Sequence, residues 1–161
     1  MPLTLNKCVY TYNNIHNQLF KLVKKLKKYK PDILIAISSG GLIPGKILKS
    51  FLNLPLYIVS VKSYDENHNQ LGKIDIIQWC HQDFSDKKIL LIDEIDDTRK
   101  TLEFCTKKLK SENNPDSIAI CVVHNKKKKK IGTLEKNIEY FSALEVDDEW
   151  IEYPWEHQKI L

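Results

Sequence analysis

Residues 89–102 read Ile-Leu-Leu-Ile-Asp-Glu-Ile-Asp-Asp-Thr-Arg-Lys-Thr-Leu, three local patterns joined without a gap. Ile89 to Ile92 is a continuous apolar run, typical of a strand that is buried on both faces in a parallel sheet. Residues 93–101 then place four acidic residues and two hydroxyl side chains within nine positions. From Thr101 onward, apolar residues recur at helical spacing (Leu102, Cys105). The stretch predicts a strand, a polar loop and a helix in direct succession.

A loop in this position can hold both ends of a phosphorylated sugar. Open α/β folds bind ligands at the carboxyl edge of the sheet, where a strand gives way to a helix. Hydroxyls and free backbone N–H groups at a helix N-terminus favour a phosphate, and carboxylates suit Mg²⁺ or sugar hydroxyls. An acidic turn that caps a helix is the alternative. Four acidic residues and two threonines behind an apolar strand exceed what a cap requires.

Length and composition describe an ordinary one-domain protein. The 161 residues are enough for a single domain, 1–161, with a substantial core. The net charge of +4 is mild and does not by itself indicate nucleic acid. Four cysteines without a C-x-x-C pair indicate reduced thiols in a cytoplasmic protein. No signal peptide and no apolar segment near the ~18 residues of a membrane span is apparent, so we expect no membrane contact.

Apolar periodicity predicts the remaining elements. Helices are expected at about 13–29 and 43–52, and strands at 33–37, 56–61, 74–79 and 117–123. Between the first strand and its helix lies Ser38-Ser39-Gly40-Gly41. Small residues there let the backbone approach an anion closely, although a plain tight turn has the same composition.

The acidic stretch resembles the phosphoribosyl-pyrophosphate (PRPP) signature of type I phosphoribosyltransferases. That signature has four apolar residues, two acidic residues, two variable positions and Asp-Thr-Gly-x-Thr. The sequence departs from it at Arg99, which stands where the family usually has Gly. The resemblance implies an α/β type I phosphoribosyltransferase fold, with a mostly parallel central sheet flanked by helices. It also implies a small hood from the N-terminal segment and about 132–161.

Further likenesses narrow the family to enzymes of 6-oxopurines. Residues 150–156, Trp-Ile-Glu-Tyr-Pro-Trp-Glu, resemble stretches of the bacterial xanthine-guanine and fungal hypoxanthine-guanine phosphoribosyltransferases. The Asp-Asp-Thr-Arg form of the loop also resembles the fungal group. The likeness covers the chain from about Tyr12 to Glu156. It implies a purine salvage transferase that moves 5-phosphoribosyl from PRPP to N9 of hypoxanthine, guanine or xanthine, with Mg²⁺ as cofactor.

The resemblance assigns the PRPP side of the site. The motif residues expected to bind PRPP are Asp93, Glu94, Asp96, Asp97, Thr98, Arg99, Lys100 and Thr101. Asp93 and Glu94 should face the ribose hydroxyls and Mg²⁺, and Asp97 should act near purine N7 as the catalytic acid or base. Residues 98–101 should hold the 5′-phosphate, to which Arg99 still offers its backbone N–H. Ser38, Ser39, Gly40 and Gly41 resemble the pyrophosphate loop, which often has a basic residue at the position of Ser39 and a non-proline cis peptide before it.

The purine side is assigned in the same way and leaves one choice open. A family lysine that donates to the purine 6-oxo group corresponds to His124 or Lys126. Trp150 should stack on the purine, and the Ile151 carbonyl could accept a hydrogen bond from a 2-amino group. Glu156 matches a carboxylate near a second metal position, whereas Trp155 is interpreted as an anchor of the tail.

Two further segments bear on function. Residues 62–75 form a long polar segment that begins Ser63-Tyr64 and resembles the mobile active-site flap of the purine enzymes. Five lysines at 126–130 are interpreted as a solvated loop, so nucleic acid is not an expected partner. The alternative function is a PRPP-sensing regulator of the same fold, which the lysines and Ser39 would favour. The presence of Asp97 and Ser63-Tyr64 favours the enzyme, which we expect to be a homodimer or homotetramer.

Overall fold

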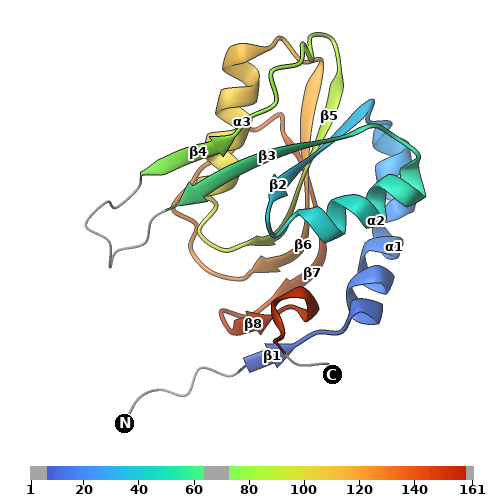
Figure 1. Ribbon diagram of the computed structural model, residues 1–161, viewed down its shortest axis with the longest axis vertical. Coiled ribbons are helices and arrows are strands. Elements are labelled where there is room, and N and C mark those ends of the chain that lie inside the picture. The colour runs from blue at the N-terminus through green and yellow to red at the C-terminus, as the bar shows by residue number, and fades with distance from the viewer. Residues whose placement is uncertain (1–6, 64–72, 159–161) are drawn as a thin grey trace.

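Six strands form the central sheet in the order β4-β3-β2-β5-β6-β7 within residues 7–63 and 73–158, the part of the chain that this computed structural model describes (Figure 1). The strands are β1 (Lys7–Val9), β2 (Ile33–Ser38), β3 (Leu56–Ser63), β4 (Ile74–Gln78), β5 (Lys88–Asp96), β6 (Ser117–Lys126), β7 (Glu139–Val146) and β8 (Trp150–Glu152). The helices are α1 (Tyr12–Tyr29), α2 (Leu42–Leu52) and α3 (Lys100–Glu112), with a 3-10 turn at Pro154–Glu156. The predicted mixed α/β fold is confirmed.

The sheet contains one topological switch point, between β2 and β5. The chain leaves β2 for β3 on one side and later returns to β5 on the other side of β2. All neighbouring strands from β3 to β7 run parallel, and only the edge strand β4 is antiparallel. The carboxyl ends of β2 and β5 therefore open into a crevice, the usual ligand position in such sheets.

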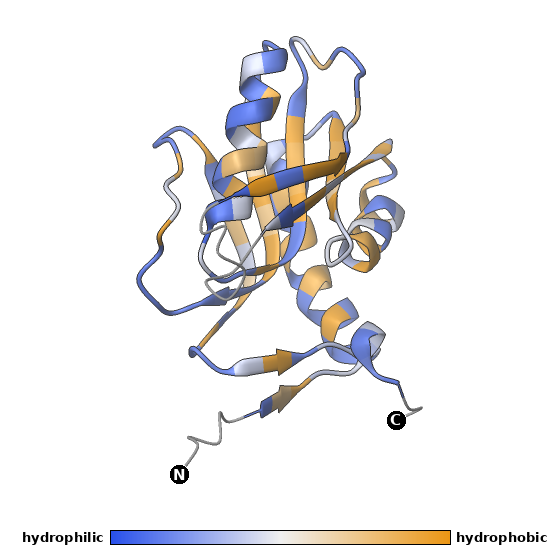
Figure 2. Cartoon of the chain, turned by 60° about the vertical axis from the view of Figure 1, so that its left-hand side comes forward, coloured by the Kyte–Doolittle hydropathy of each residue, from blue (hydrophilic) through white to orange (hydrophobic). Residues whose placement is uncertain are grey.

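Helices cover both faces of the sheet. Helices α1 and α2 pack on one face and α3 on the other, each turning its apolar side to the strands (Figure 2). Helix α1 begins with a capping box, in which the Thr11 side chain accepts from the backbone N–H of Asn14. It ends at Tyr29, and the cap residue Lys30 is in the left-handed conformation, directly before Pro31. Fully buried leucines such as Leu19 and Leu90 each contribute about 1.5–3 kcal/mol by leaving water.

Strand β5 is longer than the sequence predicted. It continues past Ile92 to Asp96 because β6 also continues, pairing Asp93 with Val122 and Asp96 with Asn125. The first acidic residues of the expected loop are therefore strand residues, and the loop itself starts at Asp97.

The expected hood is smaller in the structure than the range 132–161. Strand β7 lies in that range, yet it pairs in parallel with β6 as the edge strand of the large sheet. Strands β1 and β8 form a separate two-stranded sheet, below the large sheet in the view of Figure 1. Of the expected flap, residues 62–63 end β3 and 74–75 begin β4, whereas Tyr64 lies outside the described residues.

All four cysteines carry free thiols, and Cys105 and Cys121 are buried in the core. In the described part of the chain, no helix combines the length and apolarity needed to cross a membrane. The cytoplasmic setting inferred from the cysteines stays a prediction.

Candidate active site

The Ser38–Gly41 loop lies directly against the acidic end of β5. A Cβ atom built on Gly40 would overlap the Glu94 carboxyl group. A Cβ on Gly41 would lie 2.5 Å from the Ile92 carbonyl oxygen and 2.7 Å from that of Ile37. Glycine is therefore required at Gly41, where a Cβ would meet backbone atoms, and at Gly40 it leaves room for the Glu94 side chain. The Ser38–Ser39 peptide is cis, as in the loop that this segment resembles.

Asp93 and Glu94 form an electrostatically unfavourable pair at the end of β5. Burial and the neighbouring charge of Glu94 hold the pKa of Asp93 well above its ordinary value. Burial also raises the pKa of Glu94 to about 7, although a hydrogen bond from Trp155 opposes the shift and the charge of Glu156 adds to it. A divalent cation would remove this penalty by favouring the charged carboxylates.

The donor set suits Mg²⁺ bound together with a substrate rather than Mg²⁺ bound by protein alone. Among residues 7–63 and 73–158, no three His, Cys, Asp or Glu side chains gather into a metal site. Mg²⁺ commonly uses one or two carboxylates plus substrate phosphates and waters. Asp93 and Glu94, beside the glycine loop, offer that arrangement.

The C-terminal segment reaches into the site through Trp155 and Tyr153. Trp155 Nε1 donates to Glu94 Oε2 at 2.9 Å, and the Tyr153 hydroxyl donates to the Glu94 carbonyl oxygen at 3.3 Å. The two rings stack, with centroids 4.8 Å apart. Trp155 is thus the expected anchor of the tail, and it also orients a site carboxylate, a contact that sequence reasoning missed.

The phosphate loop, residues 98–101, leads into α3 as predicted. Arg99 has φ 70° and ψ 0°, a left-handed conformation that glycine adopts more readily. Helix α3 begins at Lys100, so the first backbone N–H groups of the helix have no intrahelical partners and are free for an anion. The backbone geometry fits the expected binding of a 5′-phosphate.

Asp96 and Arg99 do not direct their side chains to this anion position. Asp96 is 1% exposed, and its Oδ2 accepts from Arg99 Nε at 2.9 Å and from the Tyr140 hydroxyl at 2.7 Å. The Asp96 carboxylate is therefore enclosed by protein. Direct contact of these two side chains with PRPP is therefore not what the structure favours.

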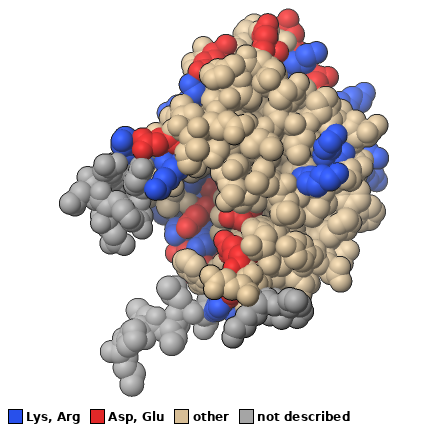
Figure 3. All heavy atoms as spheres, in the orientation of Figure 1, with Lys and Arg blue, Asp and Glu red and all other residues tan. Residues whose placement is uncertain are grey.

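The lysine run is not a uniformly solvated loop, because alternate lysines turn inward. Lys126 and Lys128 contact Asp97, and Lys130 donates to backbone carbonyl oxygens next to it. Lys127 and Lys129 are exposed. Strand β6 ends at Lys126, so the inward turn of Lys128 and Lys130 belongs to the irregular segment that follows, where both contact the acidic loop. Figure 3 shows acidic and basic side chains meeting in a hollow between the two sheets.

Asp97, the predicted catalytic residue, lies at the centre of these charges. Lys128 Nζ is 2.7 Å from its Oδ1, and Lys126 Nζ is 3.7 Å from its Oδ2. Both ammonium groups also contact Asp148 Oδ1, at 3.1 Å and 3.3 Å respectively. Asp97 remains partly open to solvent, as a group that exchanges a proton with a substrate must be.

The structure separates the two candidates for the 6-oxo group. His124 is 0% exposed, with its Nδ1 2.9 Å from the Tyr153 hydroxyl, and burial lowers its pKa to about 4. Either atom can be the donor in this contact, and the buried Nε2 of His124 has no hydrogen-bond partner among the described residues. A fully buried, neutral imidazole offers one donor at most, whereas a lysine ammonium offers three. Lys126, 8% exposed and beside Asp97, is the better donor.

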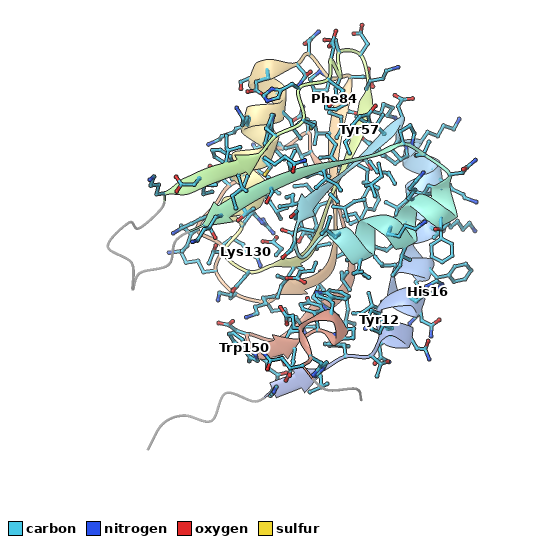
Figure 4. All side chains as sticks on the ribbon, in the orientation of Figure 1. Tyr12, His16, Tyr57, Phe84, Lys130 and Trp150 are labelled. Carbon is cyan, nitrogen blue, oxygen red and sulfur yellow. The ribbon has the colours of Figure 1, made fainter. Side chains whose placement is uncertain are left out.

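The remaining purine-side residues lie in the small sheet. Trp150 on β8 is 60% exposed and labelled in Figure 4, below Lys130 in that view. Ile151 is buried, with its side chain in the core that faces α1. Glu156 Oε2 accepts from the Tyr153 backbone N–H at 3.1 Å. Trp150 is therefore available to a flat ligand, and Glu156 is close enough to Glu94 to affect its pKa.

Comparisons with known proteins agree with this geometry. A phosphoribosyl transferase domain model matches residues 11–158. Hypoxanthine-guanine phosphoribosyltransferase of Schizosaccharomyces pombe is 35% identical over 184 residues, covering 94% of this chain and 89% of the relative. Xanthine phosphoribosyltransferase 1 of Saccharomyces cerevisiae is 33% identical over 187 residues, covering 93% and 90%.

Solved structures share the fold. A hypothetical protein from Neisseria gonorrhoeae with bound ppGpp has a TM-score of 0.88 and 37% identity, over 96% of this chain and 92% of that one. A purine phosphoribosyltransferase from Pyrococcus horikoshii has a TM-score of 0.80 and 29% identity, over 98% of both chains.

Proposed function

The chain belongs to the phosphoribosyl transferase family, and we propose that it transfers the 5-phosphoribosyl group of PRPP to N9 of a 6-oxopurine, releasing pyrophosphate. One observation carries this proposal. The phosphate loop, the acidic pair and the Asp97–Lys126 contact all lie at the carboxyl edge of β5 and β6, beside the switch point. A phosphorylated sugar and a base can therefore be held on either side of one reaction centre.

PRPP is held at three points in this proposal. The backbone N–H groups and hydroxyls of residues 98–101 hold the 5′-phosphate. Asp93 and Glu94 face the ribose hydroxyls and the metal-binding side. The Ser38–Gly41 loop holds the pyrophosphate through its backbone, without the basic side chain that related loops often carry. Lys46 and Lys62 are the lysines that we expect to contribute positive charge to pyrophosphate binding.

Mg²⁺ is the proposed cofactor, with Asp93 and Glu94 as its protein ligands and Glu156 as a more distant carboxylate. When bound, it would neutralise charge on the leaving pyrophosphate. The protein contributes two carboxylates whose raised pKa values favour a cation partner, and a glycine loop beside them.

The purine is held between Lys126 and Trp150. Lys126 donates to the 6-oxo oxygen, Trp150 stacks on the ring, and the Ile151 carbonyl is an acceptor for a 2-amino group. During transfer the bond from ribose C1 to the pyrophosphate oxygen breaks and the bond from C1 to N9 forms. Asp97 takes the proton that the purine loses at N7.

The regulator alternative is not favoured. Its main pointer was the lysine run, and three of those lysines contact the acidic loop instead of forming a free basic surface. The relatives named above are enzymes. The ligand of the Neisseria structure combines guanine, ribose and pyrophosphate groups, which are the parts that the proposed site has to hold. A homodimer or homotetramer stays an expectation.

The test is a nucleotide-forming assay with PRPP, Mg²⁺ and each of hypoxanthine, guanine, xanthine and adenine. We expect turnover with at least one 6-oxopurine and little with adenine, because Lys126 has no acceptor at an exocyclic amine. A gel shift with RNA and DNA at physiological salt should show no specific complex. Binding of nucleic acid without turnover of any base would favour the regulator.

A further inference from the structure

We propose that Asp96, Arg99, Lys130 and Tyr140 form a brace that positions the phosphate loop for PRPP. This inference deepens the function proposed above and rests on it. The four side chains are positioning residues, because they contact the loop and one another rather than the expected place of the substrate.

The buried carboxylate of Asp96 is the centre of the brace. Its Oδ2 accepts from Arg99 Nε at 2.9 Å, Arg99 Nη2 at 2.8 Å and the Tyr140 hydroxyl at 2.7 Å. The guanidinium also lies over the Tyr140 ring, 5.2 Å from its centroid. These contacts join the end of β5, the start of α3 and the edge strand β7. A charge enclosed in this way needs its partners, so the geometry is tightly specified.

Lys130 fixes the backbone on the outer side of the loop. Its Nζ donates to the carbonyl oxygens of Asp96 at 2.7 Å, Asp97 at 3.1 Å and Lys126 at 2.8 Å. One ammonium group thus joins the acidic end of β5 to the strand that carries the proposed purine donor. The Lys130 side chain is largely buried, with 12% of its surface exposed.

The residues after Lys130 continue the same support. The backbone N–H groups of Ile131 and Gly132 both donate to the Thr98 carbonyl oxygen at 3.0 Å. A Cβ on Gly132 would lie 2.5 Å from the Arg99 carbonyl oxygen, which accepts from Glu103 N in the first turn of α3. Every carbonyl oxygen from Asp96 to Arg99 therefore has a donor on the protein side.

These hydrogen bonds to the carbonyl oxygens explain how the loop can present N–H donors to an anion. With the four carbonyl oxygens engaged, the peptide units of the loop have fixed orientations, and the N–H groups at the start of α3 remain for the phosphate. It also explains Arg99 at a left-handed position. Glycine adopts that conformation more easily, and the ion pair with Asp96 offsets the disadvantage of a side chain there.

The first experiment compares Lys130→Met and Tyr140→Phe with Lys129→Met, an exposed lysine of the same run. We expect KM for PRPP to rise about tenfold in the first two, since each removes a hydrogen bond to a buried acceptor. The kcat and the purine KM should stay close to wild type in Tyr140→Phe, whose lost hydroxyl contacts Asp96, and Lys129→Met should change none of the three. Calorimetric titration with ribose 5-phosphate should show the same loss of affinity without requiring turnover.

The second experiment tests the ion pair by a double-mutant cycle. Arg99→Gly alone should raise KM for PRPP, because it leaves the Asp96 carboxylate with fewer donors. In the Asp96→Asn background the same change should matter less, since a neutral amide needs no cation. Additive effects would contradict the coupling.

The outcomes separate this inference from the proposed function. If wild type turns over no base, the proposed function fails, and ribose 5-phosphate binding still tests the brace. If wild type is active and both Lys130→Met and Tyr140→Phe keep normal PRPP KM and ribose 5-phosphate affinity, the brace is overturned. An equal loss of purine and PRPP affinity together with a lowered Tm would indicate general loss of structure and would also overturn it.

Discussion

The two loops at the switch point are built in opposite ways. The Ser38–Gly41 loop contains no charged side chain, and its two glycines let it lie against β5. Residues 93–101 carry six charged side chains, and those of Asp96, Asp97 and Arg99 are paired within the protein. The first loop depends on close backbone approach and the second on charges fixed in place. Either arrangement can hold a phosphate, because backbone donors are available in both.

The loops meet at Glu94, which lies over Gly40 and accepts from Trp155. This carboxylate therefore belongs to both arrangements, since it is fixed by the tail and is also part of the proposed metal-binding pair. Substitutions in the two loops should therefore affect different kinetic constants. Four predictions test this difference.

The largest effect is expected at Asp97, the one acidic residue of its loop that is placed for proton transfer. Asp97→Asn should lower kcat by ~10²–10⁴, the usual range for removal of a general acid or base. PRPP affinity should stay near wild type, because the amide keeps the shape of the loop. Steady-state kinetics with varied PRPP measures both values, and an unchanged kcat would remove Asp97 from the mechanism.

The next effect is expected at Gly40, in the uncharged loop. Gly40→Ala should displace the Glu94 carboxylate and lower kcat/KM for PRPP by up to ~10², the cost of misplacing a group by about 1 Å. Gly45→Ala is the matched control, because its Cβ would meet the Ala36 side chain at 3.0 Å, away from Glu94. Equal kinetics in the two variants would mean that the contact between the loops has no role.

A smaller effect separates the purine side from both loops. Lys126→Met should raise the KM for hypoxanthine about tenfold, since it leaves the 6-oxo oxygen without a donor. His124→Asn should lower Tm through loss of the contact with Tyr153 and leave the purine KM nearly unchanged. The reverse pattern in hypoxanthine kinetics would return the donor role to His124.

The smallest effect concerns pH and the charge of Glu94. Its pKa of about 7 lies above the ordinary value of 4.5, so the folded state favours the protonated form. The stability that this contributes is present below pH 4.5 and is lost as pH rises through about 7. Between pH 5 and 8, Tm of the metal-free wild type should therefore fall by a few degrees relative to Glu94→Gln. Parallel curves for the two proteins would contradict the shift.

The sequence predicts the two loops better than it predicts their surroundings. The apolar runs and the residues between them were sufficient to place both loops at one sheet edge, and the structure confirms those strands and helices. Strand β7 was missed because it is half exposed at the sheet edge and lacks a continuous apolar run. The lysine run was misinterpreted because its composition alone does not show which lysines turn inward. Strand β6 ends at Lys126, so no regular period extends through the run.

Contacts between distant segments could not be predicted at all. Trp155 and Glu94 are 61 residues apart in sequence, and no local sequence pattern links residues at that separation. The Asp96–Arg99 pair had a local signal, because opposite charges lie three residues apart. The role of this pair depends on its contacts with Tyr140 and Lys130. These residues come close to Asp96 only through the packing of β7 and the lysine run.

The most direct test of the central claim is a stoichiometry measurement by phosphorus NMR. PRPP, Mg²⁺ and hypoxanthine are incubated with the wild-type protein, and the signals of PRPP, pyrophosphate and purine nucleotide are followed together. The account predicts that pyrophosphate and nucleotide appear in equal amounts and that neither appears when the base is omitted. Release of pyrophosphate without nucleotide, or no change in PRPP with any 6-oxopurine, would contradict it.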